Sequence, residues 1–166
     1  CNCCPKCTNF YIFPEIQINL ADGSEYNAAL IEKEPDIDLA FLLINQKQVT
    51  ERKAKLPAVD ISKRINEGDV GIAEEVIGLS RSSPVYAYIP SVIPGYVSAI
   101  SKRKHTYYIT TAGTSQGVPI FTKDGRFVGL TLQNIVEGRR TNLLGTLAAG
   151  TVKTYADLAA STQNLR

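Results

Sequence analysis

The amino-acid sequence predicts an all-β protein that ends in a single helix. Segments in which apolar and polar residues alternate recur along most of the chain, and a period of two is typical of strands that bury one face. Turn signals separate these segments, among them the Asp-Gly pairs at Asp22-Gly23 and Asp124-Gly125. Near the C-terminus the spacing of apolar residues becomes helical. Many short strands at such intervals indicate a β-barrel or a β-sandwich.

Three strands are expected in the first third of the chain. Ile16–Leu20 alternates apolar and polar residues, and the turn at Asp22-Gly23 leads into a second strand, Tyr26–Ile31. Leu39–Ile44 is apolar throughout, which predicts a strand buried on both faces. Lys47–Lys55 is polar and is expected to be a connection.

The remaining chain predicts further strands and the closing helix. Leu56–Gly68 is expected to be irregular. The helix is expected over Thr151–Ala160 with Thr151 as its N-cap, because its apolar residues recur at helical spacing. The strands expected before it are Gly71–Leu79, Val85–Ile89, Gly95–Ser101, Tyr107–Thr111, Ile120–Phe121, Arg126–Leu132 and Leu143–Leu147.

Composition excludes several classes of protein. With 166 residues, 44% of them hydrophobic and 20% charged, the chain is long enough for one compact domain and unlike a disordered protein. A net charge of +2 gives no basis for nucleic-acid binding, and the basic run Lys102–His105 is expected to be a solvated turn. No apolar run approaches the length needed to span a bilayer.

All the cysteines fall within the first seven residues, so no disulfide is expected to link distant parts of the chain. One pair has the C-x-x-C spacing of half a zinc site. A local disulfide or a free terminus is the alternative to zinc, and no other cofactor is expected. The cysteines are Cys1, Cys3, Cys4 and Cys7.

Several stretches, in this order, resemble segments of trypsin-like serine proteases of the HtrA/Deg branch. They are Leu20–Gly23 with Glu34–Leu42, Gly95–Ile100, Gly117–Phe121 with Asp124–Leu130, and Leu147–Val152. The resemblance implies a chymotrypsin/trypsin-like double β-barrel with a C-terminal helix, the first barrel being incomplete in this chain. The segments are then a cysteine-rich stretch (1–10), a partial first barrel (11–50), an inter-barrel connection (51–68), the second barrel (69–150), and the helix and tail (151–166).

The resemblance also implies where the catalytic residues lie. Asp38 takes the position of the carboxylate that orients the catalytic histidine. Without a gap, Gln116 stands at the position of the nucleophile; with one inserted residue, Ser115 does. Gly113, Thr114 and Gly117 complete the loop that would bind the oxyanion.

The sequence departs from the family pattern in ways that bear on catalysis. Glutamine is no nucleophile, and a residue inserted after Ser115 would distort the oxyanion loop. His105, the only histidine, follows Asp38, whereas the family histidine precedes the aspartate.

We therefore expect a catalytically inactive pseudo-protease that binds peptides or proteins, or serves as a scaffold in an assembly. One expected partner segment completes the first barrel, because open strand edges tend to be covered. The alternatives are an active serine endopeptidase whose histidine lies upstream of residue 1, and a module assembled through metal at the cysteines. The resemblance favours a periplasmic, secreted or organellar location.

Overall fold

The computed structural model describes residues 16–20, 22–56, 59–136 and 139–163, so the four cysteines lie outside the described residues. The chain divides into two compact units. The first is drawn from Cys1–Leu30 and Leu42–Leu56, and the second from Ile31–Phe41 and Pro57–Arg166. No described helix is both long and apolar enough to cross a membrane.

A three-stranded antiparallel sheet begins in the first unit. Its order is β1 (Ile16–Asn19), β2 (Glu25–Glu34) and β3 (Leu39–Ile44), and the far ends of β2 and β3 belong to the second unit. Gly23 takes a φ of 81° in the predicted β1–β2 turn. The expectation that β3 is buried on both faces is wrong, because Leu42 and Leu43 are exposed to solvent.

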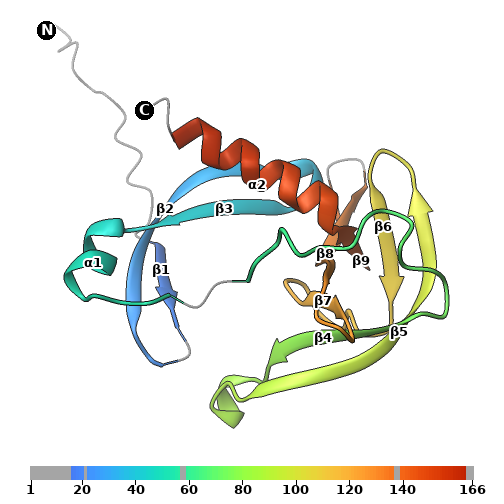
Figure 1. The fold of residues 1–166 in the computed structure, drawn as a ribbon, viewed down its shortest axis with the longest axis horizontal. Coiled ribbons are helices and arrows are strands. Elements are labelled where there is room, and N and C mark those ends of the chain that lie inside the picture. Colours follow the sequence, from blue (N-terminus) through green and yellow to red (C-terminus); the bar gives the residue numbers. More distant parts are fainter. Residues whose placement is uncertain (1–15, 21, 57–58, 137–138, 164–166) are drawn as a thin grey trace, which may run out of the picture. The chain divides into compact units, whose positions relative to one another are not determined.

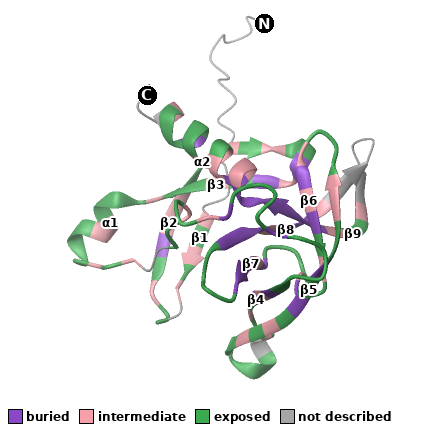
Figure 2. Cartoon of the chain, turned by 45° about the vertical axis from the view of Figure 1, so that its right-hand side comes forward, coloured by how far each residue is buried: buried purple, intermediate pink, exposed green. Residues whose placement is uncertain are grey.

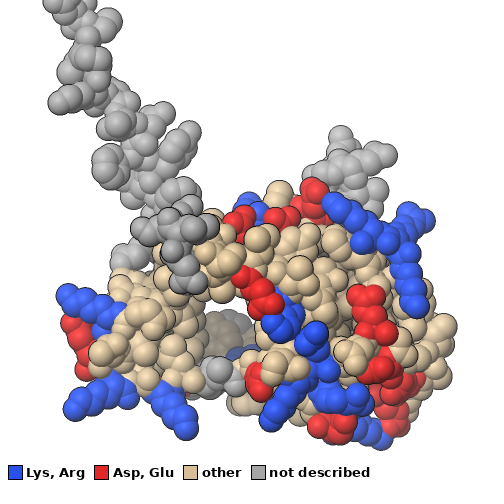
Figure 3. Space-filling view, turned by 45° about the horizontal axis from the view of Figure 1, so that its top comes forward, with Lys and Arg blue, Asp and Glu red and all other residues tan. Residues whose placement is uncertain are grey.

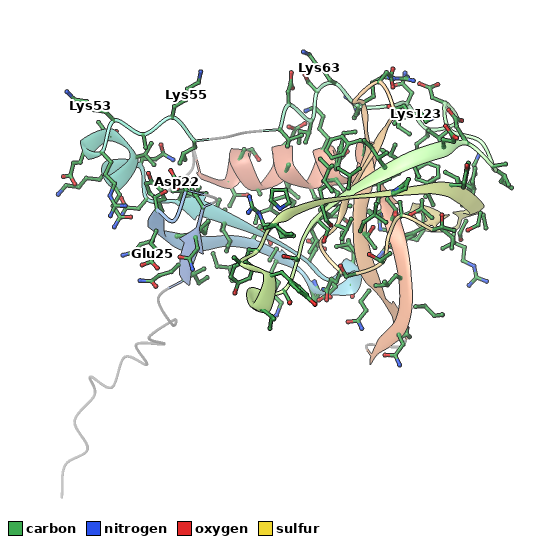
Figure 4. All side chains as sticks on the ribbon, turned by 90° about the horizontal axis from the view of Figure 1, so that it is seen from below. Asp22, Glu25, Lys53, Lys55, Lys63 and Lys123 are labelled. Atoms are coloured by element: carbon green, nitrogen blue, oxygen red, sulfur yellow. The ribbon has the colours of Figure 1, made fainter. Side chains whose placement is uncertain are left out.

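A short helix, α1 (Gln46–Glu51), replaces part of the connection expected over Lys47–Lys55. The Asn45 side chain starts it by accepting hydrogen bonds from the backbone N–H groups of the second and third residues that follow it. Lys53 and Lys55 come after the helix and point away from the strands (Figure 4). The helix was not expected because its residues are mostly polar and none is buried, so no apolar spacing indicates it; its N-terminus depends on the Asn45 cap.

The second unit contains a closed antiparallel barrel with the strand order β4-β5-β6-β9-β8-β7 (Figure 1). Closure leaves no edge along most of the barrel wall. Gly125, with a φ of 83°, forms the predicted hairpin turn between β7 and β8. The strands are β4 (Glu75–Arg81), β5 (Pro90–Lys102), β6 (Thr106–Thr110), β7 (Pro119–Thr122), β8 (Phe127–Val136) and β9 (Arg139–Ala148).

One expected strand is absent, and the closing helix begins earlier than expected. Val85–Ile89 is not a strand: it contains most of a 3₁₀ turn, η2 (Pro84–Tyr86), at the tip of the β4–β5 hairpin. The closing helix α2 (Ala149–Gln163) begins at Ala149, so Thr151 lies inside the helix and is not its N-cap. Ala149 is buried, and tertiary packing therefore sets the start of this helix.

Two clusters of buried side chains hold the second unit together. One is built from strand residues such as Val76, Val97 and Ile120, which are fully buried. The other joins the barrel to α2, through Val152, and to the 3₁₀ turn η1 (Pro35–Ile37). Burial of each large aliphatic side chain contributes about 1.5–3 kcal/mol. Figure 2 shows the buried residues concentrated on the barrel strands.

Tyr108 carries a buried polar group that its surroundings do not satisfy. The residue is 1% exposed, and its hydroxyl forms no hydrogen bond of normal geometry with the described residues, although the Gly68 backbone lies near. Burial, with the Glu67 carboxylate as a second cause, raises the pKa of this hydroxyl. A buried hydroxyl without a partner costs about 1–3 kcal/mol.

We expect Tyr108→Phe to raise the free energy of unfolding by about 1 kcal/mol in urea denaturation near neutral pH. Because its pKa is raised, the Tyr108 hydroxyl stays protonated to a higher pH in the folded state than in the unfolded state. The free energy of unfolding is therefore unaffected by this group below the pKa of tyrosine in the unfolded chain, 10.0, and falls as the pH rises above that value. In Tyr108→Phe this alkaline loss should shrink. A loss of stability at neutral pH would mean that the hydroxyl has a partner.

Candidate active site

Asp38 is placed by the two buried residues that flank it. Ile37 and Leu39 both belong to the core cluster beneath α2, so the chain is anchored on either side. Between them Asp38 takes φ 54° and ψ 40°, in the left-handed region that Asp tolerates better than most residues. The carboxylate, half exposed, is thus held at the surface of the second unit.

The loop between β6 and β7 is anchored in the same way. Its ends, Ala112 and Val118, are buried, whereas Thr114, Ser115 and Gln116 are exposed. A Cβ atom on Gly113 would lie 2.8 Å from the Thr131 hydroxyl oxygen and 3.0 Å from that of Thr110. Gly117 has a φ of 82°. Both glycines are therefore needed for the loop to take this path.

A hydrogen bond joins Asp38 to this loop across 78 residues of sequence. The Gln116 amide Nε2 donates to the Asp38 carboxylate Oδ2 at 2.5 Å. Both residues belong to the second unit. In the trypsin-like proteases that the sequence resembles, an imidazole N–H makes this bond to the carboxylate. Here a neutral amide makes it, and an amide cannot take a proton from a hydroxyl at neutral pH.

Several N–H groups of the loop are already engaged within the protein. An oxyanion hole uses the N–H of the nucleophile and that of the residue two before it. If Gln116 holds the nucleophile position, the second donor is Thr114 N–H, which donates to the Ala112 carbonyl at 3.1 Å. If Ser115 holds it, the second donor is Gly113 N–H, which donates to the Thr110 hydroxyl at 3.1 Å. In either alignment one of the two oxyanion donors is occupied.

His105 lies in the β5–β6 turn and is half buried rather than exposed. Its ring packs edge-on against Tyr155 of α2, with centroids 6.1 Å apart, and its Nε2 is buried without a partner among the described residues. The rest of the basic turn is solvated as expected. Lys104 forms an ion pair with Asp36 at 3.6 Å, both being exposed. The histidine therefore has a packing role against the helix.

A cleft of about 550 Å³ opens beside the loop. Residues 115–118 form one wall, and residues 79–81 and 90–92 of the β4–β5 hairpin form the rest. No pattern in the sequence marks the hairpin residues as part of a site. The one available signal was the run of apolar and aromatic residues at Val85–Ile89, which was interpreted as a strand.

No cluster of three or more metal-ligating side chains occurs among the described residues. The cysteines proposed for zinc lie outside these residues, so the zinc site stays a prediction. Acidic and basic side chains are interspersed on the face shown in Figure 3. Lys123 pairs with Glu75, and Arg126 pairs with Asp124.

Comparisons with known proteins agree with this architecture. Residues 4–130 match the model of the trypsin-like peptidase domain. The chain is similar to the MamO protease domain from Magnetospirillum magneticum in its apo form, with 19% identity and a TM-score of 0.58, covering 87% of this chain and 76% of that one. It is similar to the HtrA-type protease AlgW with a decapeptide, with 18% identity and a TM-score of 0.59, covering 91% of this chain and 45% of that one.

No curated protein matches the sequence. The identities to the two solved structures are low, so the likeness concerns the fold, and the chain spans less than half of the AlgW chain. The expected fold class is confirmed: an all-β, trypsin-like double barrel with a C-terminal helix, in which the second barrel is closed and the first is incomplete.

Proposed function

Since the chain belongs to the trypsin-like peptidase family, we propose that it is a non-catalytic member that binds peptide or protein segments within a larger assembly. The observation that carries this proposal is the hydrogen bond from Gln116 to Asp38. It engages the orienting carboxylate with a group that has no acid–base chemistry. The one oxyanion donor that is occupied in either alignment gives further support, because transition-state stabilisation requires that N–H group to be available.

The expected loss of activity is large. Removing any member of a Ser-His-Asp constellation leaves only about 10³–10⁴-fold catalysis over water. Here two features depart from that constellation, the residue bonded to the carboxylate and the geometry of the loop. Binding needs neither a nucleophile nor a base, since it requires only a complementary surface.

The sheet β1-β2-β3 supports a partner that completes the first barrel. In the part of the chain that the structure describes, β1 and β3 each pair with β2 alone, so each has one open edge. Open edges bind further strands readily. We propose that a strand from a partner or from another part of the same protein covers them.

Reaction with a fluorophosphonate probe tests the loss of catalysis. The full chain is treated under native conditions beside trypsin as the active control, and adducts are located by intact mass and peptide mapping. We expect no adduct on Ser115, because an unactivated serine hydroxyl is a poor nucleophile. Ser115→Ala should likewise show no adduct when its mass is compared before and after treatment.

A stoichiometric adduct on Ser115 that is absent from Ser115→Ala would contradict the proposal. It would favour the alternative of an active endopeptidase in which Ser115 is the nucleophile. Ser115 is exposed at the wall of the cleft, so the probe can reach it. The absence of an adduct would therefore mean that the Ser115 hydroxyl is not activated, and not that the probe cannot reach it.

A further inference from the structure

The tip of the β4–β5 hairpin exposes apolar side chains to an unusual extent. Val85 is 86% exposed, Tyr86 66% and Val92 63%, and Tyr88 and Ile89 are more than half exposed. Figure 2 shows the end of this hairpin as largely exposed residues that project from the barrel. A cluster of exposed apolar residues of this kind marks an interaction site.

The backbone at the tip takes a conformation that its residues disfavour. Ala87 and Tyr88 have φ values of 54° and 53°, which hairpin turns normally assign to Asn or Gly. Hydrogen bonds hold this turn from both sides. Ser82 N–H donates to the Ile89 carbonyl at 3.0 Å, and Arg81 Nη1 donates to the Tyr88 carbonyl at 3.1 Å. Strain maintained by surrounding bonds is typical of functional surfaces.

An open strand edge continues from this tip into the cleft. β4 pairs with β5 along Glu75–Arg81, but β7 pairs with β4 only as far as Gly78. Residues 79–81 therefore have no strand on their other side among the described residues. The cleft lies where β7 would have continued, between this edge and residues 115–118. Its volume is within the range of roughly 300–1,000 Å³ that suits small ligands or a few peptide residues.

The charge of the cleft indicates which peptide it would take. Of the described residues that line it, Arg81 alone is charged, and the others are apolar or carry hydroxyl, amide or backbone groups. Arg81 uses one nitrogen for the Tyr88 carbonyl, and a guanidinium has five donors. A carboxylate is the group that satisfies the remaining donors best.

We propose that this cleft binds an extended peptide that adds a strand to residues 79–81, places an acidic side chain on Arg81 and packs an aliphatic side chain against the hairpin tip. The inference rests on the proposed binding function and assigns its site and ligand class. Backbone pairing along the open edge gives affinity, and alternate side chains give specificity. The occupant is an extended segment with acidic and aliphatic side chains and not a folded surface, because one wall of the cleft is an open strand edge.

Fluorescence anisotropy with defined peptides tests the proposal. The probe is a short fluorescein-labelled peptide of alternating valine and threonine with one central glutamate, and its comparison peptide has lysine in place of the glutamate. We expect saturable binding of the glutamate peptide by the full chain. The lysine peptide should bind about tenfold more weakly, as expected when one charge-assisted hydrogen bond is lost.

Charge reversal within the cleft provides the decisive variant. Arg81→Glu should invert the preference so that the lysine peptide binds more tightly than the glutamate peptide. Arg103→Glu makes the same change at an exposed position in the β5–β6 turn and should leave the preference unaltered. Circular dichroism of both variants checks that the barrel is intact.

The tip is tested separately, because Arg81 also holds the turn. Val85→Ser should weaken binding of the glutamate peptide severalfold, since it removes an exposed apolar contact without touching the core. Val59→Ser, an exposed valine outside the hairpin, is the matched control. On binding, hydrogen exchange of the amides at residues 79–81 should slow.

The outcomes separate this proposal from the proposed function. If the glutamate peptide binds but Arg81→Glu and Val85→Ser behave like their controls, the binding function stands and the site assigned here is wrong. If neither peptide binds, the assigned site and ligand class are overturned. A fluorophosphonate adduct on Ser115 would contradict the non-catalytic function whatever the peptides do.

Discussion

Replacing Gly129 with alanine is expected to destabilise the second unit severely. Gly129 pairs with Ala148 across the β8–β9 ladder, and a Cβ atom on it would lie 2.0 Å from the Leu147 carbonyl oxygen. That oxygen is backbone in the wall of a closed barrel, so it cannot move aside as a flexible side chain could. Overpacking of this kind costs about 3 kcal/mol or more, a large part of the total stability of a domain.

Urea denaturation, followed by circular dichroism, measures this effect. Gly71→Ala is the matched control, because a Cβ on Gly71 would meet only the end of the Glu74 side chain, at 3.9 Å. Its effect should lie within about 1 kcal/mol of zero. If Gly129→Ala unfolded at the same urea concentration as Gly71→Ala, the close approach of β8 and β9 at this position would be wrong.

Local patterns in the sequence were enough to predict much of the fold. Alternating residues mark β1, and the glycines at positions 23 and 125 adopt the positive φ that Asp-Gly turns require. These signals are local because strand alternation and turn conformation depend on near neighbours. The double barrel itself followed from the resemblance of ordered segments and not from periodicity.

Features that individual hydrogen bonds determine were not predictable in this way. The apolar run Val85–Ile89 has strand-like residues, but its backbone turns through η2 and two positive φ values. Hydrogen bonds from Arg81 and Ser82, which close the end of the hairpin, override its propensity. The α1 helix was not predicted because the single Asn45 cap starts it and it has no buried face whose spacing would indicate a helix.

The candidate active site contains one feature that the sequence predicts and one that it does not. The resemblance placed Asp38 and the loop around Gln116 in one site, but no sequence pattern shows that the amide of one donates to the carboxylate of the other. Gly113 is held by the packing of Thr110 and Thr131 beneath it, whatever residue occupies position 116. The loop can therefore keep its shape while its chemistry changes, which is the physical basis for a binding role without catalysis.

Substituting Gln116→Glu should make the stability of the second unit depend on pH. The change replaces the amide donor with a second carboxylate beside Asp38, and two neighbouring carboxylates cannot both ionise freely, so one pKa rises. A raised pKa in the folded state means that stability is present at low pH and is lost as the pH rises through it. The free energy of unfolding of the variant should fall further below that of the native chain, by about 1 kcal/mol, between about pH 4 and pH 7. This value is modest because the site is partly exposed.

Urea denaturation at both pH values, with two further variants, identifies the contact responsible. Gln116→Ala removes the hydrogen bond without adding charge, so its deficit should be similar at both pH values. Combining Asp38→Asn with Gln116→Glu reverses the pair, because the new amide can donate to the new carboxylate, and should remove most of the pH dependence. If Gln116→Glu instead showed the pH dependence of Gln116→Ala, Gln116 would not lie against Asp38 in solution. The orienting carboxylate would then not be engaged by an amide, and the main support for a non-catalytic function would be lost.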